Sequence, residues 1–323
     1  MRRGRFTLID LFSGAGGFAR GFEEVGFISL LGIDSDRAAA RSYAGNFPAS
    51  AVLAEDIRSV SCDDIRYLIG SDRVDVVIGS PPCEPFTGAN PRRRVDPLDR
   101  LYADPVGALV LEFIRIVSCL SPKVYIMENV PAITDGPLKA ALRKEFESAG
   151  LGRPYFNVLR AHEHGTPSRR VRVFISNVQL RPRRSKAPTV WDAIGDLPEP
   201  SDDPIIPNHD PPPPLSKSKL RRVARLRWGQ AMIRYEGSGG RLLPNMIRLD
   251  PRKIAPTVLG SSRFIHPFEN RLLTVREQAR LMGFPDDHVF VGGRDEQYNQ
   301  VGEAVPVPLA KAIADYIIRL LVV

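Results

Sequence analysis

The sequence predicts an α/β protein with a Rossmann-like, mostly parallel sheet covered by helices on both faces. Three observations favour this fold. The first 178 residues alternate short apolar runs with amphipathic patterns of helical period. The first apolar run ends in a glycine-rich turn that opens a helix, as in nucleotide-binding βα units. Near residue 181 a proline-rich stretch begins, so a smaller second region is expected in a chain of 323 residues.

The expected elements follow one another with short connections. Strands are expected at residues 6–12, 29–33, 52–54, 74–78, 124–127, 157–160 and 171–175, because these are short apolar runs bounded by turn-forming residues. Helices are expected at 16–25, 36–47, 63–69, 105–120 and 137–149, where apolar residues recur with helical spacing. Residues 181–215 are loop-like, with four prolines at 211–214, and residues 308–321 form a closing amphipathic helix.

The composition is that of a basic, soluble protein. Apolar residues make up 43% of the chain and charged residues 25%, as in ordinary soluble enzymes. The net charge of +8 and the pI near 9.6 favour a polyanionic partner. No apolar run approaches the roughly 20 residues of a membrane span. The basic residues 1–5 lead into no signal-peptide cleavage site. We therefore expect a cytoplasmic protein without a membrane partner.

The three cysteines predict neither a disulfide nor a metal site. Cys62, Cys83 and Cys119 are odd in number and far apart in the chain, which argues for a reducing compartment and against a zinc site. Cys119 falls in an apolar pattern and is expected in the core.

A ligand site is predicted at the end of the first strand. Gly14, Gly16 and Ala19 fit the Gly-x-Gly-x-x-Gly/Ala turn, in which a missing Cβ lets a ligand approach the backbone. Asp34 follows the second strand at the spacing of a ribose-binding acid. Asp56 follows the third strand and is a candidate partner for an adenine amino group. A tight turn without a ligand is the alternative for the glycines alone, and NAD, FAD and S-adenosylmethionine all fit this pattern.

A candidate nucleophile follows the fourth strand. Residues 78–85, Ile-Gly-Ser-Pro-Pro-Cys-Glu-Pro, place Cys83 just past an apolar run. Reaction sites of open parallel sheets lie beyond the carboxyl ends of their strands, and two prolines stiffen the loop. A rigid thiol at this edge is a candidate nucleophile. A lone cysteine is otherwise more often a small apolar side chain packed under a loop.

Six motifs, in order along nearly the whole chain, resemble those of the C5-cytosine DNA methyltransferases of the prokaryotic restriction-modification type. They lie at residues 10–17 (cofactor turn), 79–83 (nucleophile loop), 127–130 (Met-Glu-Asn-Val), 165–174 (arginine motif), 271–285 and 297–306. The family transfers a methyl group from S-adenosylmethionine to cytosine. The resemblance implies a Rossmann-like catalytic domain with a mixed, mostly parallel sheet at residues 1–178 and 295–323. It also implies a smaller target-recognition domain at 179–294.

The resemblance implies roles for single residues. Cys83 would attack C6 of a flipped cytosine, and Glu128 would act at N3. Arg172 would donate to O2, and Arg170 would hold the site together. S-adenosylmethionine would bind Asp10, Phe12, Gly14, Gly16, Gly17, Asp34, Ser35, Asp56, Ile57, Pro81, Leu109, Glu303, Ala304 and Val305. Taken alone, Glu128 would more often cap a helix or form a salt bridge, and the arginines would form an exposed basic strand face.

Basic residues outside these motifs are candidates for contacts with DNA. The set comprises Arg92, Arg93 and Arg94 after the nucleophile loop, and Lys217, Arg225 and Arg227 in the basic stretch that follows the prolines. A solvated charge run is the alternative for 92–94. Since Arg221, Arg225 and Trp228 fit one helical face, a plain surface helix is the alternative for the second group.

The chain departs from the family pattern at three positions. Glu84 and Ser168 stand where the family has glutamine, and Glu303 stands where it generally has asparagine. None of the three changes removes a group that performs chemistry, so an active enzyme is expected.

The resemblance implies a monomeric enzyme acting on double-stranded DNA, with or without a separately acting restriction endonuclease. A tRNA methyltransferase is the alternative, because residues 80–87 resemble that branch of the family, whereas residues 191–198 resemble the prokaryotic DNA enzymes. A catalytically silent nucleic-acid-binding protein is a third hypothesis. The intact Cys83, Glu128 and Arg172 argue against it.

Overall fold

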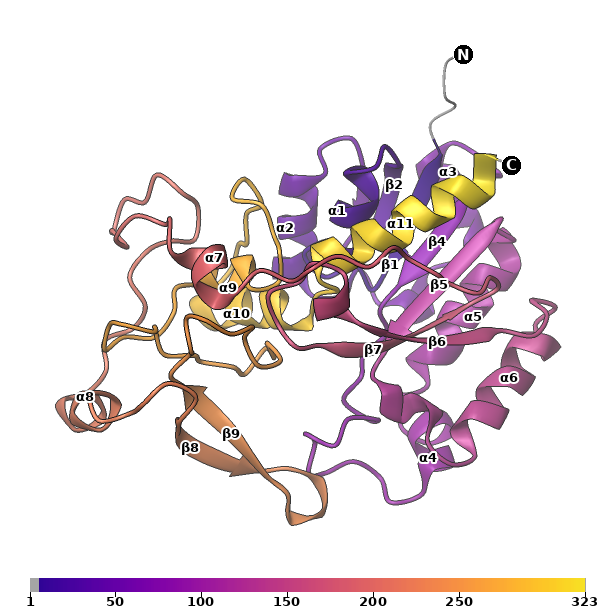
Figure 1. Cartoon of the computed structure of the whole chain (residues 1–323). Helices are drawn as coiled ribbons and strands as arrows, with labels where there is room; N and C mark the ends of the chain where they lie inside the picture. Colours follow the sequence, from indigo (N-terminus) through magenta and orange to yellow (C-terminus); the bar gives the residue numbers. More distant parts are fainter. Residues whose placement is uncertain (1–5, 323) are drawn as a thin grey trace.

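The centre of the fold is a seven-stranded sheet (Figure 1). The structure is a computed structural model that describes residues 6–322, so residues 1–5, considered above for a signal peptide, lie outside it. The strands are β1 (Thr7–Leu11), β2 (Ile28–Ile33), β3 (Ala51–Leu53), β4 (Val76–Gly79), β5 (Val124–Asn129), β6 (Tyr155–Arg160) and β7 (Val171–Ser176). Their order is β3-β2-β1-β4-β5-β7-β6, and only β7 runs antiparallel to its neighbours in this sheet. The expected mixed, mostly parallel sheet is confirmed.

Two layers of helices cover the sheet, and each has its own apolar core. The helices α1 (Gly17–Glu23), α2 (Arg37–Asn46) and α11 (Val307–Val322) pack on one face, and α3 (Cys62–Ile69), α5 (Leu109–Leu120) and α6 (Leu138–Ser148) on the other. Strand side chains alternate between the two cores: Val76 and Ile126 belong to the first, and Val77 and Met127 to the second. Strands buried on both faces explain why the sequence shows continuous apolar runs there.

Capping residues define the helix starts that the sequence indicated. The Asp36 carboxylate accepts hydrogen bonds from the amides of Ala38 and Ala39, at 2.7 and 2.8 Å, at the start of α2. The short helix α4 (Pro97–Tyr102) was not predicted, although Asp96 caps it and Pro97 occupies its first position. The helix α5 starts at Leu109 rather than at residue 105, because the Asp104 carboxylate closes a separate turn before it.

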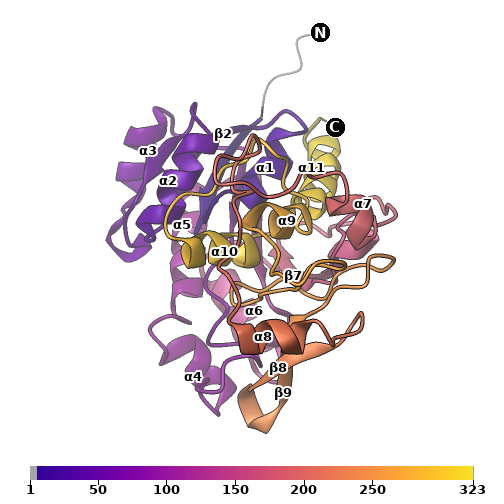
Figure 2. The ribbon, with the colours of Figure 1, turned by 90° about the vertical axis from the view of Figure 1, so that its left-hand side faces the viewer.

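The remaining elements form a second group beside the sheet (Figure 2). The helices α7 (Val190–Ile194), α9 (Val275–Arg280) and α10 (Arg294–Glu303) surround a third core. The helix α8 (Lys217–Val223) and the hairpin of β8 (Ala231–Glu236) and β9 (Leu242–Ile247) share a small fourth core. Because α8 ends at Val223, Arg225 and Trp228 lie in the loop after it, and the helical face expected at 221–228 is only partly formed.

The prediction that the cysteines form no disulfide is wrong for one pair. Cys62, the first residue of α3, and Cys119, near the end of α5, are disulfide-bonded, with their Cα atoms 6.5 Å apart. The two cysteines are 57 residues apart in the sequence, so their spacing did not reveal the pair. They meet because α3 and α5 pack on the same face of the sheet. Cys83 is the free cysteine of the chain.

A close contact between α1 and α11 gives a test of the packing. A Cβ on Gly21 would lie 2.5 Å from Ala310 Cβ and 2.5 Å from the backbone nitrogen of Lys311. We expect Gly21→Ala to lower the free energy of unfolding by roughly 1–3 kcal/mol, measured by urea denaturation, because α11 must move. Gly45→Ala is the control: Gly45 in α2 has no atom within 4 Å of such a Cβ. It should raise stability by about 0.5–1 kcal/mol. Equal effects of both changes would contradict the packing.

Candidate active site

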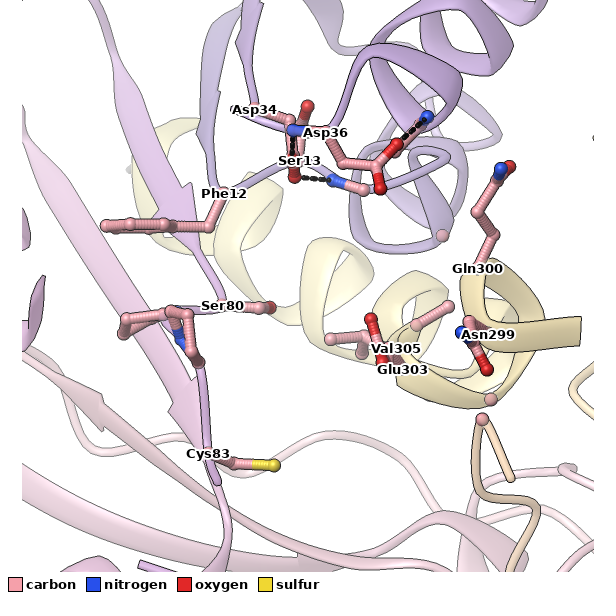
Figure 3. Close-up of a pocket in the computed structure, with 18 of the residues that line it drawn as sticks. Phe12, Ser13, Asp34, Asp36, Ser80, Cys83, Asn299, Gln300, Glu303 and Val305 are labelled. Carbon is pink, nitrogen blue, oxygen red and sulfur yellow. Dashed lines mark hydrogen bonds between the residues drawn. The ribbon is translucent and has the colours of Figure 1, made fainter. Parts of the chain in front are cut away.

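One cavity of about 610 Å³ lies at the carboxyl ends of the parallel strands (Figure 3). This volume suits a small molecule, and the position is where open α/β sheets bind their ligands. The cavity brings together almost all of the residues expected in the site: Asp10, Phe12, Gly14, Gly17, Asp34, Ser35, Asp56, Ile57, Pro81, Cys83, Leu109, Glu128, Arg170, Arg172, Glu303, Ala304 and Val305.

The glycine turn opens on the cavity at Gly14 and not at Gly16. Gly14 has φ 54°, and a Cβ there would meet no atom within 4 Å, so its open side is free for a ligand. Gly16 does not line the cavity. A Cβ on Gly16 would lie 2.2 Å from the Phe47 ring, so this glycine is required by packing. Phe12 also has positive φ, at 57°, a conformation that costs a non-glycine residue about 1–3 kcal/mol and that clusters at functional sites.

Two buried carboxyl groups face this turn. The Asp34 carboxylate accepts hydrogen bonds from the amides of Gly14, at 2.7 Å, and Asp36, at 2.9 Å (Figure 3). Asp10 is buried, and neither of its carboxylate oxygens has a hydrogen-bond partner among residues 6–322. Burial raises the pKa of Asp34, and burial together with the charge of Asp34 raises the pKa of Asp10. A cationic or hydrogen-bond-donating ligand would satisfy the unpaired oxygens.

Asp56 lies on the rim of the cavity and already has a partner. Its carboxylate accepts hydrogen bonds from the Arg58 guanidinium, at 2.5 Å for the closest pair of atoms, and these bonds lower the pKa of Asp56. A ligand at Asp56 would therefore share the carboxylate with Arg58.

The loop that carries Cys83 is held in place by backbone contacts. The amides of Phe86 and Thr87 donate to the Cys83 carbonyl at 3.0 and 2.9 Å. The Asn129 side-chain amide, at the end of β5, donates to the Pro81 carbonyl at 3.0 Å. Burial raises the pKa of the Cys83 thiol to about 11, while the positive charge of Arg172 opposes the shift. The thiol is therefore protonated at neutral pH in the free protein.

The antiparallel strand β7 brings Arg172 to Glu128. Glu128 pairs with Phe174 in the β5–β7 ladder, so residue 172 lies one step further along the same face. The Arg172 Nε atom lies 2.8 Å from Glu128 Oε1, and both side chains are largely buried. The pair places a carboxyl group and a guanidinium on the same side of the cavity as Cys83.

Arg170 connects the sheet to the end of α10. Its guanidinium donates to the carbonyls of Val258, at 2.9 Å, Gly302, at 2.8 Å, and Glu303, at 3.2 Å. The last two carbonyls belong to the C-terminal turn of α10, where a positive charge is favourable. This contact fixes residues 303–305 in the cavity wall.

The basic residues expected to contact DNA lie outside the cavity and differ in their surroundings. Arg93 is partly buried: it donates to Ser238 Oγ at 2.8 Å and to the Phe86 carbonyl at 3.1 Å. The Ser238 amide in turn donates to the Gly88 carbonyl at 2.9 Å. Arg93 therefore connects the cysteine loop to the β8–β9 hairpin, and the basic run 92–94 is anchored at its centre. The other five candidates are exposed: Arg92, Arg94, Lys217, Arg225 and Arg227. Among these five, and within residues 6–322, only Arg94 has a carboxylate within reach of an ion pair.

Sequence reasoning missed three residues that build the site. Asn129 was part of a recognised motif but had no assigned role. Tyr235 of β8 lines the cavity, although none of the six motifs includes it. His288 is fully buried, and its Nε2 atom donates to the Ala15 carbonyl at 2.8 Å, which supports the glycine turn. Burial lowers the pKa of His288 to about 3, so the ring is neutral. No sequence pattern marks a contact between residues so far apart.

Among residues 6–322, no cluster of three or more His, Cys, Asp or Glu side chains could hold a metal ion. No helix in this part of the chain is long and apolar enough to cross a membrane.

The raised pKa of Cys83 predicts its reactivity. Because only the thiolate reacts with iodoacetamide, alkylation of Cys83 in the free protein should be slow at pH 8 and should accelerate with pH toward about 11. The rate is followed by mass spectrometry of the peptide containing Cys83, with the urea-unfolded protein as the control for an ordinary thiol. A rate that reaches its plateau near pH 8 would contradict the burial of the thiol.

Comparisons with known proteins identify the family. The model of the C-5 cytosine-specific DNA methylases matches residues 6–319. A protein of Methanocaldococcus jannaschii, provisionally named a type II methyltransferase, is 47% identical over 313 residues, which cover 95% of this chain and 97% of that protein. Type II methyltransferase M1.HphI of Haemophilus parahaemolyticus is 35% identical, with coverage of 97% and 87%. A solved Escherichia coli structure, provisionally titled a prophage DNA modification methyltransferase, is 26% identical with a TM-score of 0.79 and coverage of 98% and 100%. The resemblance drawn from the six motifs is confirmed, and the chain belongs to the C-5 cytosine-specific DNA methylase family.

Proposed function

We propose that this chain is a DNA (cytosine-5-)-methyltransferase that transfers a methyl group from S-adenosylmethionine to C5 of a flipped cytosine in a specific duplex sequence. The observation that carries the proposal is the composition of one cavity. It joins a nucleotide-binding turn with carboxylates at successive strand ends to a free cysteine beside a Glu–Arg pair. One half suits the cofactor and the other half suits the base.

The residues at the glycine turn fit S-adenosylmethionine. The unpaired, buried carboxylate of Asp10 and the open side of Gly14 suit the cationic methionine end, and Asp34 suits the ribose hydroxyls. When bound, the cofactor supplies an electrophilic methyl group. The wall that would hold it comprises Phe12, Gly17, Ser35, Asp56, Ile57, Pro81, Leu109, Glu303, Ala304 and Val305.

The base half supplies the chemistry that cytosine needs. In the proposed mechanism the Cys83 thiol passes its proton to water as its sulfur bonds to C6, and the C5–C6 electron pair makes C5 nucleophilic. Glu128, acting as a carboxylic acid, shares its proton with N3, and the Arg172 guanidinium donates to O2, so the negative charge that develops there is stabilised. After methylation C5 loses its proton to water, the C5–C6 double bond re-forms and the Cys83 thiolate leaves. Arg170 acts as a positioning residue, because it holds together two segments that are far apart in the chain, at Val258 and at the end of α10.

Target recognition is proposed for residues 179–294, with the catalytic domain at 1–178 and 295–323. The exposed Arg225 and Arg227 are candidates for base contacts and Lys217 for phosphate contacts, while Arg92 and Arg94 extend the basic surface from the cysteine loop. Flipping the base costs a few kcal/mol, which phosphate contacts must offset. A movement of the β8–β9 hairpin on DNA would change the position of the cysteine loop through the hydrogen bond between Arg93 and Ser238.

DNA is favoured over tRNA as the substrate. The family and the relatives named type II methyltransferases support a DNA enzyme that methylates duplex sites. Residues 80–87 are the only motif that favoured the tRNA branch.

Methylation of unmodified genomic DNA and of total tRNA by the purified protein tests this function. With radiolabelled S-adenosylmethionine, label should enter the DNA and not the tRNA, and bisulfite sequencing should place 5-methylcytosine in one short motif. Cys83→Ser should abolish incorporation because no covalent bond to C6 can form, whereas Cys62→Ser should retain activity. Label in tRNA alone would replace the proposal with the RNA alternative.

Asp34→Ala tests the cofactor half separately. Loss of a charged hydrogen-bond acceptor of the ribose should weaken S-adenosylmethionine binding by roughly tenfold or more in calorimetry. Asp63→Ala removes an exposed carboxylate of α3 and serves as the control. An unchanged dissociation constant in Asp34→Ala would remove Asp34 from the cofactor site.

A further inference from the structure

The cavity is strongly acidic although the protein is basic. Its wall holds nine carboxyl side chains and two guanidinium groups: Asp10, Asp34, Asp36, Glu55, Asp56, Glu84, Glu128, Glu296 and Glu303, with Arg170 and Arg172. The chain as a whole has a net charge of +8. Negative charge gathered in a concave site raises the local concentration of cations, so the cavity is suited to a cationic ligand.

Glu303 occupies a particular place in this wall. It is the last residue of α10, and its backbone is fixed by the hydrogen bond from Arg170 to its carbonyl. Its side chain is exposed, but it is exposed into the cavity, between the end marked by Asp34 and the end marked by Cys83 (Figure 3). A ligand that extends from Asp34 toward a base held at Cys83 must pass Glu303.

The reacting part of the proposed cofactor is the part that passes this point. Its ribose would be held by Asp34 and its methyl group would face a base at Cys83, so the positive sulfonium would lie between these two residues. After transfer the sulfur is a neutral thioether, while the rest of the molecule is unchanged. A carboxylate at Glu303 therefore interacts differently with substrate and product.

We propose that Glu303, supported by Glu84, is a specificity-determining residue that makes the site bind S-adenosylmethionine in preference to its neutral product, S-adenosylhomocysteine. This inference rests on the proposed function. Both positions carry a carboxylate where the family pattern has an amide, so the distinguishing change is one of charge. The consequence is weaker product inhibition than an amide at these positions would give.

The ionisation of Glu303 makes the preference depend on pH. The cavity wall shields the Glu303 carboxyl group from bulk solvent, and this desolvation raises its pKa to about 7. The negative charges of Glu84 and Asp34 add to the shift, and Arg170 opposes it. Asp36, at the start of α2, adds to the same effect. Since Glu303 is more fully ionised at pH 8 than at pH 6, the preference for the cationic ligand should grow over this interval. The amino group of the methionine part titrates in both ligands, so the ratio of their affinities cancels its contribution.

Calorimetric titration of the purified protein with each ligand, at pH 6 and pH 8, tests the inference. In the unmodified protein the ratio of the dissociation constant for S-adenosylhomocysteine to that for S-adenosylmethionine should rise with pH. In Glu303→Gln at pH 8 the ratio should fall roughly tenfold and lose its pH dependence, because one nearby charge is removed. Glu84→Gln should reduce the ratio by a smaller factor. Glu55→Gln removes a carboxylate from the rim beside Asp56 and is the charge-matched control, for which the ratio should fall far less than in Glu303→Gln.

The outcomes separate this inference from the function on which it rests. If the unmodified protein binds neither ligand, the proposed function fails. If it binds both but the ratio is the same in Glu303→Gln, or falls equally in Glu55→Gln, the role of Glu303 is overturned. Circular dichroism of each variant establishes that it is folded. If Glu303→Gln does not fold, Glu84→Gln provides the test.

Discussion

The buried guanidinium of Arg170 is the interaction on which the site depends. It lies at the start of β7 and is 2% exposed, yet its hydrogen bonds go to carbonyls from two distant parts of the chain, at Val258 and at the end of α10. Burial lowers the pKa of Arg170 to about 9, so the group remains charged at neutral pH. A buried charge is tolerated only when acceptors surround it, so the Arg170 guanidinium requires the carbonyls at the end of α10 to stay in place. The same contacts therefore fix residues 303–305 in the cavity wall.

The reversed direction of β7 has a similar consequence for the chemistry. In a fully parallel sheet, the carboxyl end of β5 would lie beside the carboxyl end of its neighbour. Because β7 is antiparallel, its amino-terminal end comes to Glu128, and Arg172 reaches the carboxylate within 2.8 Å. Asn129 then links the same strand end to the cysteine loop through the Pro81 carbonyl. The end of β5 thus carries Glu128 itself and also contacts the cysteine loop through Asn129.

The sequence was sufficient for the parts of the structure that depend on local pattern. Apolar runs such as 124–127 mark buried strands, and caps such as Asp36 mark helix starts, so the sheet and its two helical layers were predicted closely. It was insufficient where distant residues meet. The disulfide of Cys62 and Cys119, the packing of Gly16 against Phe47 and the support of the glycine turn by His288 all depend on tertiary contacts. The same holds for Arg93, for which the sequence predicted a contact with DNA, with a solvated charge run as the alternative, and which bonds to the β8–β9 hairpin.

The distribution of charge joins these observations. Arginines and lysines lie on the outer surface of the cysteine loop and of the second group of elements, whereas carboxylates line the cavity. A polyanion is therefore attracted to the outside, and a cation to the inside.

The Cys83 thiol lies where the two environments meet. Burial keeps the pKa of the Cys83 thiol high, the negative charges of Glu84 and Glu128 add to the shift, and the positive charges of Arg172 and Arg170 oppose it. A cationic ligand in the cavity would act in the same direction as these arginines, favouring the thiolate. In the proposed enzyme, cofactor binding would thus be coupled to activation of the Cys83 thiol through the electrostatics of a single cavity.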